Sequence, residues 1–190
     1  MSAIEGFLTK IREAAERDDR GYLATLRRGL SDTTQQQAWP LIVPWCNRFE
    51  DETVRKIWCT IGGMAALLCR SNLDCRTDAS LASVMREIDE KRKKVKEGSN
   101  KDDQDGRNPS EQKFRRILNS PDAIDLCNLA VPIVRMAERE NIPLNCLDLF
   151  WSLMQWNDQN KRDDIRVRWT RDFYRVTEPE VQNTPDKEDE

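Results

Sequence analysis

Residues 50–70 read EDETVRKIWCTIGGMAALLCR. Apolar side chains recur in this stretch at steps of three and four residues, which predicts a long helix with one apolar stripe. Gly62 and Gly63 lie inside the pattern at some cost in helix propensity, and we expect them to let another helix approach closely. This stretch is the strongest helical signal in the chain. The stripe consists of Val54, Ile57, Trp58, Ile61, Ala65 and Leu68.

The same periodicity continues on both sides of this helix. Ser2 is a plausible N-cap for a helix that uses Ile4, Phe7, Leu8 and Ile11. Further helices are predicted over residues 79–88, 144–156 and 160–175. Ser120 and Pro121 resemble an N-cap followed by proline at the first helical position, and Pro132 is expected to kink or break the helix that runs from there toward Glu140. No alternating strand pattern and no repeat occurs, so the predicted fold is all-α.

A polar segment divides the chain. Residues 89–108 read DEKRKKVKEGSNKDDQDGRN, in which Val95 is the single apolar residue. Because such a segment cannot bury a face, we interpret it as a solvated linker. Its basic cluster, Lys91–Lys96, fits either a frayed helix end or a nucleic-acid patch. The expected organisation is a helical bundle over residues 1–88, the linker over 89–108, and a second small bundle over 109–176.

The charge is unevenly distributed along the chain. The formal net charge is −3, from 31 Lys plus Arg against 34 Asp plus Glu. Residues 177–190 contain six acidic residues and one lysine, and we expect them to form a disordered acidic tail. The rest of the chain is therefore mildly basic. A nucleic-acid role is consistent with that balance despite the low isoelectric point of about 5.3.

The composition argues against catalysis and metal binding. The chain has no histidine, and none of its six cysteines forms a CxxC pair. Phosphate-binding glycine motifs are also missing, so we predict no enzyme activity, no cofactor and no metal. The longest run without a polar side chain, Ile61–Cys69, is far shorter than the roughly 20 residues of a membrane span. With no signal-peptide pattern at the N-terminus, we expect a cytoplasmic protein with reduced, structural thiols.

The predicted last helix carries a possible binding surface. Ile165, Trp169 and Phe173 form its apolar stripe. On the side away from the stripe, a row of arginines follows the spacing i, i+3, i+7, which suits a phosphate backbone. The alternative is a solvated face that pairs with Asp164 and Asp172, whereas Arg162 and Arg166 lie nearer the apolar edge and are placed to brace a neighbouring helix. The row consists of Arg168, Arg171 and Arg175.

Two further basic pairs are weaker signals. A further helix is predicted to open at Asp18 and Asp19 and to stop at Gly29. Arg27 and Arg28 end this helix, where a cation also favours the negative end of the helix dipole. Arg115 and Arg116, with Lys113, lie on the first predicted helix after the linker. One member of such a pair can be exposed while the other pairs internally.

Taken in order, five short motifs resemble a known family. They are Leu26-Arg27-Arg28-Gly29, Ala38-Trp39-Pro40, the helix Ile61–Leu68, Phe114-Arg115-Arg116-Ile117-Leu118 and Arg168-Trp169-Thr170-Arg171-Asp172-Phe173-Tyr174. Their order and spacing over residues 22–175 resemble the small subunit of the type I-E CRISPR surveillance complex Cascade, the CasB family. The linker and the tail lie outside the resemblance.

The resemblance implies a non-catalytic antiviral defence subunit made of two helical bundles. Such a subunit binds nucleic-acid backbone without sequence specificity and stabilises the R-loop, which comprises the crRNA–target DNA hybrid and the displaced DNA strand. Implied partners are crRNA, target DNA, the backbone and large Cascade subunits and a second copy of the chain, with no membrane. The alternative is a helical adaptor that makes only protein contacts. The candidate nucleic-acid-binding residues are Arg27, Arg28, Lys113, Arg115, Arg116, Arg168, Arg171 and Arg175.

Overall fold

A computed structural model describes residues 2–75, 77–97 and 109–175 of the chain. All regular elements in these residues are helical, which confirms the predicted all-α class. The N-terminal elements are α1 (Ala3–Glu16), α2 (Arg20–Arg27), the 3-10 helices η1 (Arg28–Leu30) and η2 (Gln35–Ala38), α3 (Trp39–Ile42) and α4 (Glu52–Arg70). They are followed by α5 (Leu81–Glu97), α6 (Pro109–Leu118), α7 (Ala123–Arg139), α8 (Cys146–Gln155) and α9 (Gln159–Tyr174).

Local capping chemistry decides where several helices begin. Ser2 caps α1 as predicted, in a capping box in which its backbone N donates to Glu5 Oε2 at 2.6 Å. The prediction for α7 was wrong, because its N-cap is Asp122, whose side chain accepts from the Asp125 backbone N. Ser120 instead donates from Oγ to Asp125 Oδ2 at 2.8 Å. Helix α7 also continues unbroken past Pro132.

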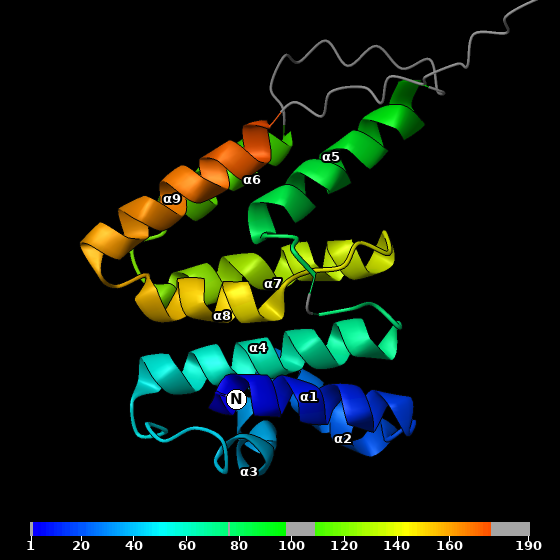
Figure 1. Cartoon of the computed structure of the whole chain (residues 1–190), viewed down its shortest axis with the longest axis vertical. Coiled ribbons are helices and arrows are strands. Elements are labelled where there is room, and N and C mark those ends of the chain that lie inside the picture. The colour runs from blue at the N-terminus through cyan, green and yellow to red at the C-terminus, as the bar shows by residue number, and fades with distance from the viewer. Residues whose placement is uncertain (1, 76, 98–108, 176–190) are drawn as a thin grey trace, which may run out of the picture.

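The helices form layers around α4 (Figure 1). In that view α1, α2 and α3 lie on one side of α4, α7 and α8 lie on its other side, and α5, α6 and α9 lie beyond them. The two glycines of α4 make close helix packing possible, as predicted. A Cβ added to Gly63 would lie 2.6 Å from Leu30 Cγ, and one added to Gly62 would lie 3.0 Å from the Phe7 ring.

One continuous core runs through the layers. The buried apolar side chains of both halves form a single cluster, in which α4 packs against α1, α2, α7 and α8. Helix α5 packs mainly against α9, and also against α6 and α7. The predicted division into two bundles is therefore not confirmed. Helix α5 also continues to Glu97, past the predicted start of the linker at residue 89. Residues 98–108 and the predicted tail, 177–190, lie outside the described residues.

All six cysteines are buried, and none of them forms a disulfide. Burial is the main cause that raises the pKa of two of these thiols. The pKa of Cys127 rises to about 12, and that of Cys59 rises to about 11. Within the described residues, no helix is both long and apolar enough to cross a membrane.

Candidate nucleic-acid interface

Arg168 is committed to an internal ion pair. Its guanidinium binds Asp148 of α8 in bidentate fashion, with Nη1–Oδ1 at 2.6 Å and Nη2–Oδ2 at 3.4 Å. Nη2 also donates to Ser152 Oγ at 2.8 Å. The prediction that Arg168 faces away from the apolar stripe was therefore wrong, because α8 packs along this flank of α9. Its partner is neither of the two aspartates considered from the sequence.

The other two arginines of the row remain accessible. Arg171 and Arg175 are exposed, and no carboxylate of the described residues pairs with either side chain. Asp172 instead accepts from Ser80 Oγ at 2.7 Å. Arg162 and Arg166 brace the neighbouring segment as expected, because they donate to the backbone oxygens of Pro121 and Leu118 at 2.9 and 2.7 Å.

The basic residues of α6 point in two directions. Arg115 pairs with Glu111 on its own helix, with Nη2–Oε1 at 2.6 Å. The same carboxylate accepts from Tyr174 Oη at 3.0 Å, and the two hydrogen bonds lower the pKa of Glu111, with Arg115 the larger cause. Lys113 and Arg116 lie on another side of α6 and line a cavity between α6 and α7. One of the two adjacent arginines is thus paired and the other is open.

We call this cavity, of about 640 Å³, the basic groove, because four of its lining residues are cations. Its cations are exposed, and no carboxylate of the described residues forms an ion pair with them. Between the cations, Leu129, Ile133 and Met136 give the groove an apolar floor. Asp125 is its one acidic lining residue, and it already accepts from Ser120. The cations are Lys113 and Arg116 of α6 with Arg135 and Arg139 of α7.

Sequence reasoning missed Arg135 and Arg139, although a signal was present. Both residues follow Asn128 and Pro132 along one face of α7, at the spacing i, i+4, i+7, i+11. All four residues are exposed. The prediction for this helix used only its apolar stripe and its prolines. It did not consider the polar face on the other side of the helix.

Arg27 and Arg28 lie apart from the groove. Arg28 is exposed and donates to the Gln37 side-chain oxygen. Arg27 lines a second cavity, of about 500 Å³, together with Arg20 and Arg70. Burial lowers the pKa of Arg27, repulsion from Arg70 adds to this, and Glu138 opposes it. The candidate residues therefore lie in separate parts of the fold. Of these residues, only Lys113 and Arg116 line the groove.

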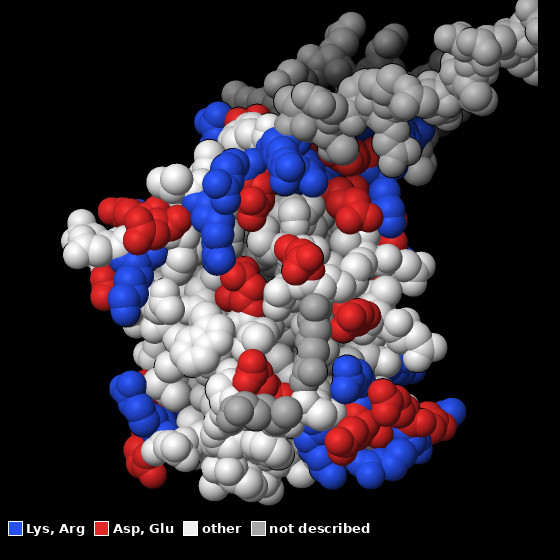
Figure 2. Space-filling view, viewed as in Figure 1, with Lys and Arg blue, Asp and Glu red and all other residues white. Residues whose placement is uncertain are grey.

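The face of the molecule that Figure 2 draws has a different character. Figure 2 shows a broad uncharged centre with isolated acidic groups, and basic side chains gather toward its edges. In the same view of Figure 1, α6 and α7 lie behind α9 and α8. Trp151, which is 45% exposed, belongs to α8 and lines a shallow, largely apolar pocket with Trp45 and Met154. This face suits protein contact better than phosphate contact.

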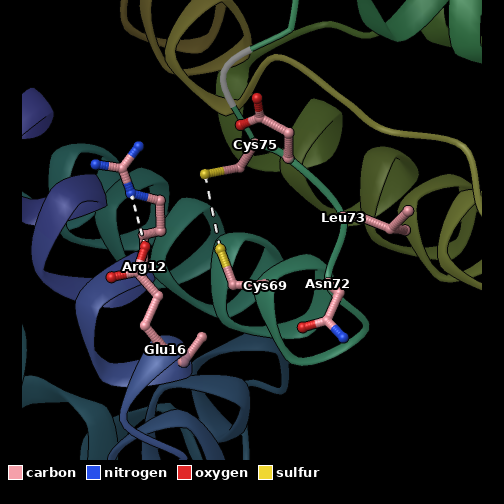
Figure 3. Close-up of a pocket in the computed structure, with 8 residues that line it drawn as sticks. Arg12, Glu16, Cys69, Asn72, Leu73 and Cys75 are labelled. Atoms are coloured by element: carbon pink, nitrogen blue, oxygen red, sulfur yellow. Dashed lines mark hydrogen bonds and ion pairs between the residues drawn. The ribbon is translucent and has the colours of Figure 1, made fainter.

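A pocket of about 270 Å³ near the end of α4 contains two thiols (Figure 3). Cys69 Sγ lies 3.8 Å from Cys75 Sγ, and this contact together with burial raises the pKa of Cys69. In the described ranges, no group of three or more acidic, cysteine or histidine side chains is arranged to hold a metal ion.

Comparisons with known proteins agree with the fold and with the motif series. A search of curated protein sequences finds no match. The crystal structure of CasB from Thermobifida fusca superposes with a TM-score of 0.64 at 19% identity, covering 90% of this chain and 94% of that one. The family profile of CRISPR-associated protein Cse2 matches residues 22–174. The chain therefore belongs to the Cse2 (CasB) family of CRISPR-associated proteins, which are subunits of Cascade, and the resemblance seen in its motifs is confirmed.

Proposed function

We propose that this chain is a non-catalytic Cascade small subunit that binds nucleic-acid backbone through the basic groove and so stabilises the R-loop. The observation that carries the proposal is the set of four exposed cations along one cavity, with no ion-paired carboxylate among the described residues to neutralise them. A cation without a carboxylate partner gains more binding free energy from a phosphate than a cation that is already paired with a carboxylate.

The geometry favours backbone contact without base readout. Guanidinium groups along the groove can bind successive phosphates for any sequence, as an RNA-guided complex requires. The apolar floor of Leu129 and Met136 offers a surface for unstacked bases, which a duplex does not expose. We therefore assign a single strand to the groove in preference to a duplex. The displaced DNA strand of an R-loop has this form.

The remaining candidate residues have different roles in the proposal. Arg171 and Arg175 supply two further cations near the end of α9, because they are exposed and no carboxylate of the described residues pairs with them. Arg27 and Arg28 form a separate contact beside α4. Arg115 and Arg168 mainly hold Glu111 and Asp148.

A specific observation supports a second role beside this one. The pocket around Trp151 and Trp45 is a surface for another protein subunit, in line with the adaptor alternative. Contacts to the backbone and large subunits, and to a second copy of the chain, would use this face, which leaves the groove open to nucleic acid.

Fluorescence anisotropy of a labelled single strand, measured against salt, tests the proposal. The variant Arg116→Gln/Arg135→Gln/Arg139→Gln should flatten the log–log salt slope by about two units, at roughly 0.7 per lost contact. The matched control is Arg12→Gln/Arg17→Gln/Arg48→Gln, which also removes three exposed arginines, none of which lines the groove. Equal slopes for wild type and the groove variant would contradict the proposal, as would an equal loss in the control.

A further inference from the structure

We propose that the acidic C-terminal segment, residues 178–190, binds the basic groove and competes there with nucleic acid. The inference rests on the proposed function for the identity of the competitor, but the contact itself can be tested without nucleic acid. Three observations carry it: where helix α9 ends, the reach of the chain beyond it, and the complementary charges of segment and groove.

Helix α9 ends beside α6, the helix that forms one wall of the groove. Phe173 stacks on Phe114 of α6, with ring centroids 4.1 Å apart, and Tyr174 Oη donates to Glu111 at 3.0 Å. The two helices run antiparallel, so the end of α9 lies beside the beginning of α6 (Figure 1). Lys113, next to Phe114 in sequence, is the groove cation on this part of α6. The chain therefore leaves α9 beside the part of α6 that carries Lys113.

The remaining chain is long enough to follow the whole groove. Residues 176–190 can span up to about 50 Å when extended. Helix α6, which forms one wall, has 10 residues and is about 15 Å long. Helix α7, the other wall, has 17 residues and is about 25 Å long. A path along both walls to Arg139 is therefore shorter than the extended segment.

The charges and the apolar groups also match. The segment carries six carboxylates and one lysine, and the groove has four cations without ion-paired carboxylates among the described residues. Val181 and Pro179 of the segment are suited to the floor of Leu129 and Met136. Because the segment is tethered, its effective concentration at the groove is in the millimolar range, so a weak contact is enough to compete with a strand.

The first test is zero-length carbodiimide crosslinking of the full chain, which joins a carboxylate to a lysine amine in direct contact. We expect crosslinks from Lys113 to the carboxylates of residues 178–190 in the monomeric product at low salt, and their loss at about 0.5 M salt. Lys10 of α1 is also exposed and serves as the control lysine. Absence of Lys113 crosslinks, or an equal yield from Lys10, would overturn the proposal.

The second test is strand binding by a chain in which the six carboxylates of the segment are replaced by Gln or Asn. We expect about tenfold tighter binding of a labelled single strand at low salt, with no difference at about 0.5 M salt. In the Arg135→Gln/Arg139→Gln background the gain should disappear, because the segment has lost its site. A gain of equal size in that background would reflect net charge alone and would overturn the proposal.

The two failures can be told apart. If neither chain binds the strand but Lys113 crosslinks to the segment, the proposed function fails and the contact between segment and groove stands. If both chains bind the strand equally and Lys113 gives no crosslink, the segment proposal fails and the proposed function stands.

Discussion

Phe114 of α6 and Phe173 of α9 stack with ring centroids 4.1 Å apart and planes 7° apart. Both rings are buried, and the Tyr174 ring packs edge-on against each of them. This contact holds α6, which carries one wall of the basic groove, against the helix that ends the described chain. The position of Lys113 and Arg116 therefore depends on it.

Replacing Phe114 by alanine should strongly destabilise the protein. Truncating a buried phenylalanine costs about 3–5 kcal/mol through lost burial and the cavity left behind. Phe114→Leu should cost clearly less, because most of the volume is retained. Urea unfolding followed by circular dichroism measures both variants. Equal stability of Phe114→Ala and wild type would show that α6 is not held by this stack.

The row of arginines on α9 should separate into one structural and two binding residues. Arg168→Gln loses the bidentate contact to Asp148, and we expect a stability loss on the order of 1 kcal/mol, since the Arg168 side chain is 39% exposed. Its affinity for a single strand should stay unchanged. Arg171→Gln/Arg175→Gln should show the reverse, with unchanged stability and weaker binding. Reduced binding by Arg168→Gln at an unchanged melting temperature would contradict this assignment.

Two glycines of α2 and α4 should respond in opposite ways to alanine. In Gly63→Ala the new Cβ would lie 2.6 Å from Leu30 Cγ and 3.1 Å from the Leu26 backbone oxygen. The resulting overpacking costs about 1–3 kcal/mol, against a gain of about 1 kcal/mol in helix propensity. In Gly21→Ala the nearest atom is Asp19 Oδ1 at 3.7 Å, an ordinary contact, so this variant should be neutral or slightly more stable. Thermal unfolding measures the melting temperatures of the two variants. A Gly63→Ala variant with a melting temperature at or above that of wild type would contradict the close packing of α4.

The buried thiols should make the protein sensitive to alkaline pH. Burial raises the pKa of Cys127 to about 12 from the usual 9.0, and that of Cys59 to about 11. Because the folded state favours the protonated thiols, their contribution is fully present below pH 9 and is lost as the pH rises toward 11–12. The melting temperature should therefore fall between pH 8 and pH 10.5, and less steeply in Cys59→Ala/Cys127→Ala. Iodoacetamide should not label these thiols in the native protein at pH 8, and rapid labelling would contradict the burial.

The sequence predicted features that depend on local periodicity and capping. The stripe of α4, the Ser2 cap and the close approach at Gly62 and Gly63 are local properties, and the structure confirms them. The extension of α5 to Glu97 was missed, because its highly charged sequence has no apolar stripe to mark a helix. Packing against α9 stabilises this helix, and Arg86 of α5 donates to the Asp172 backbone oxygen of α9.

The candidate site was predicted less well, because side-chain pairing is a non-local property. The helical spacing predicted that Arg168 belongs to an open row, but the orientation of α8 places Asp148 beside it. The groove requires α6 and α7 to lie next to each other, and no periodicity within either helix reveals that contact. The basic face of α7 could be predicted from its residue spacing. Its position next to Lys113 and Arg116 could not, because that position depends on tertiary packing.

The central claim is that the groove between α6 and α7 is where nucleic acid binds, and site-specific photocrosslinking tests it most directly. A diazirine amino acid would replace Asn128, which lines the groove, or Glu13, which is exposed on α1. Each full-length protein would be irradiated with a labelled single strand at low salt. We predict a crosslinked product from position 128 and none from position 13. Crosslinking from position 13 alone, or equally from both positions, would contradict the account.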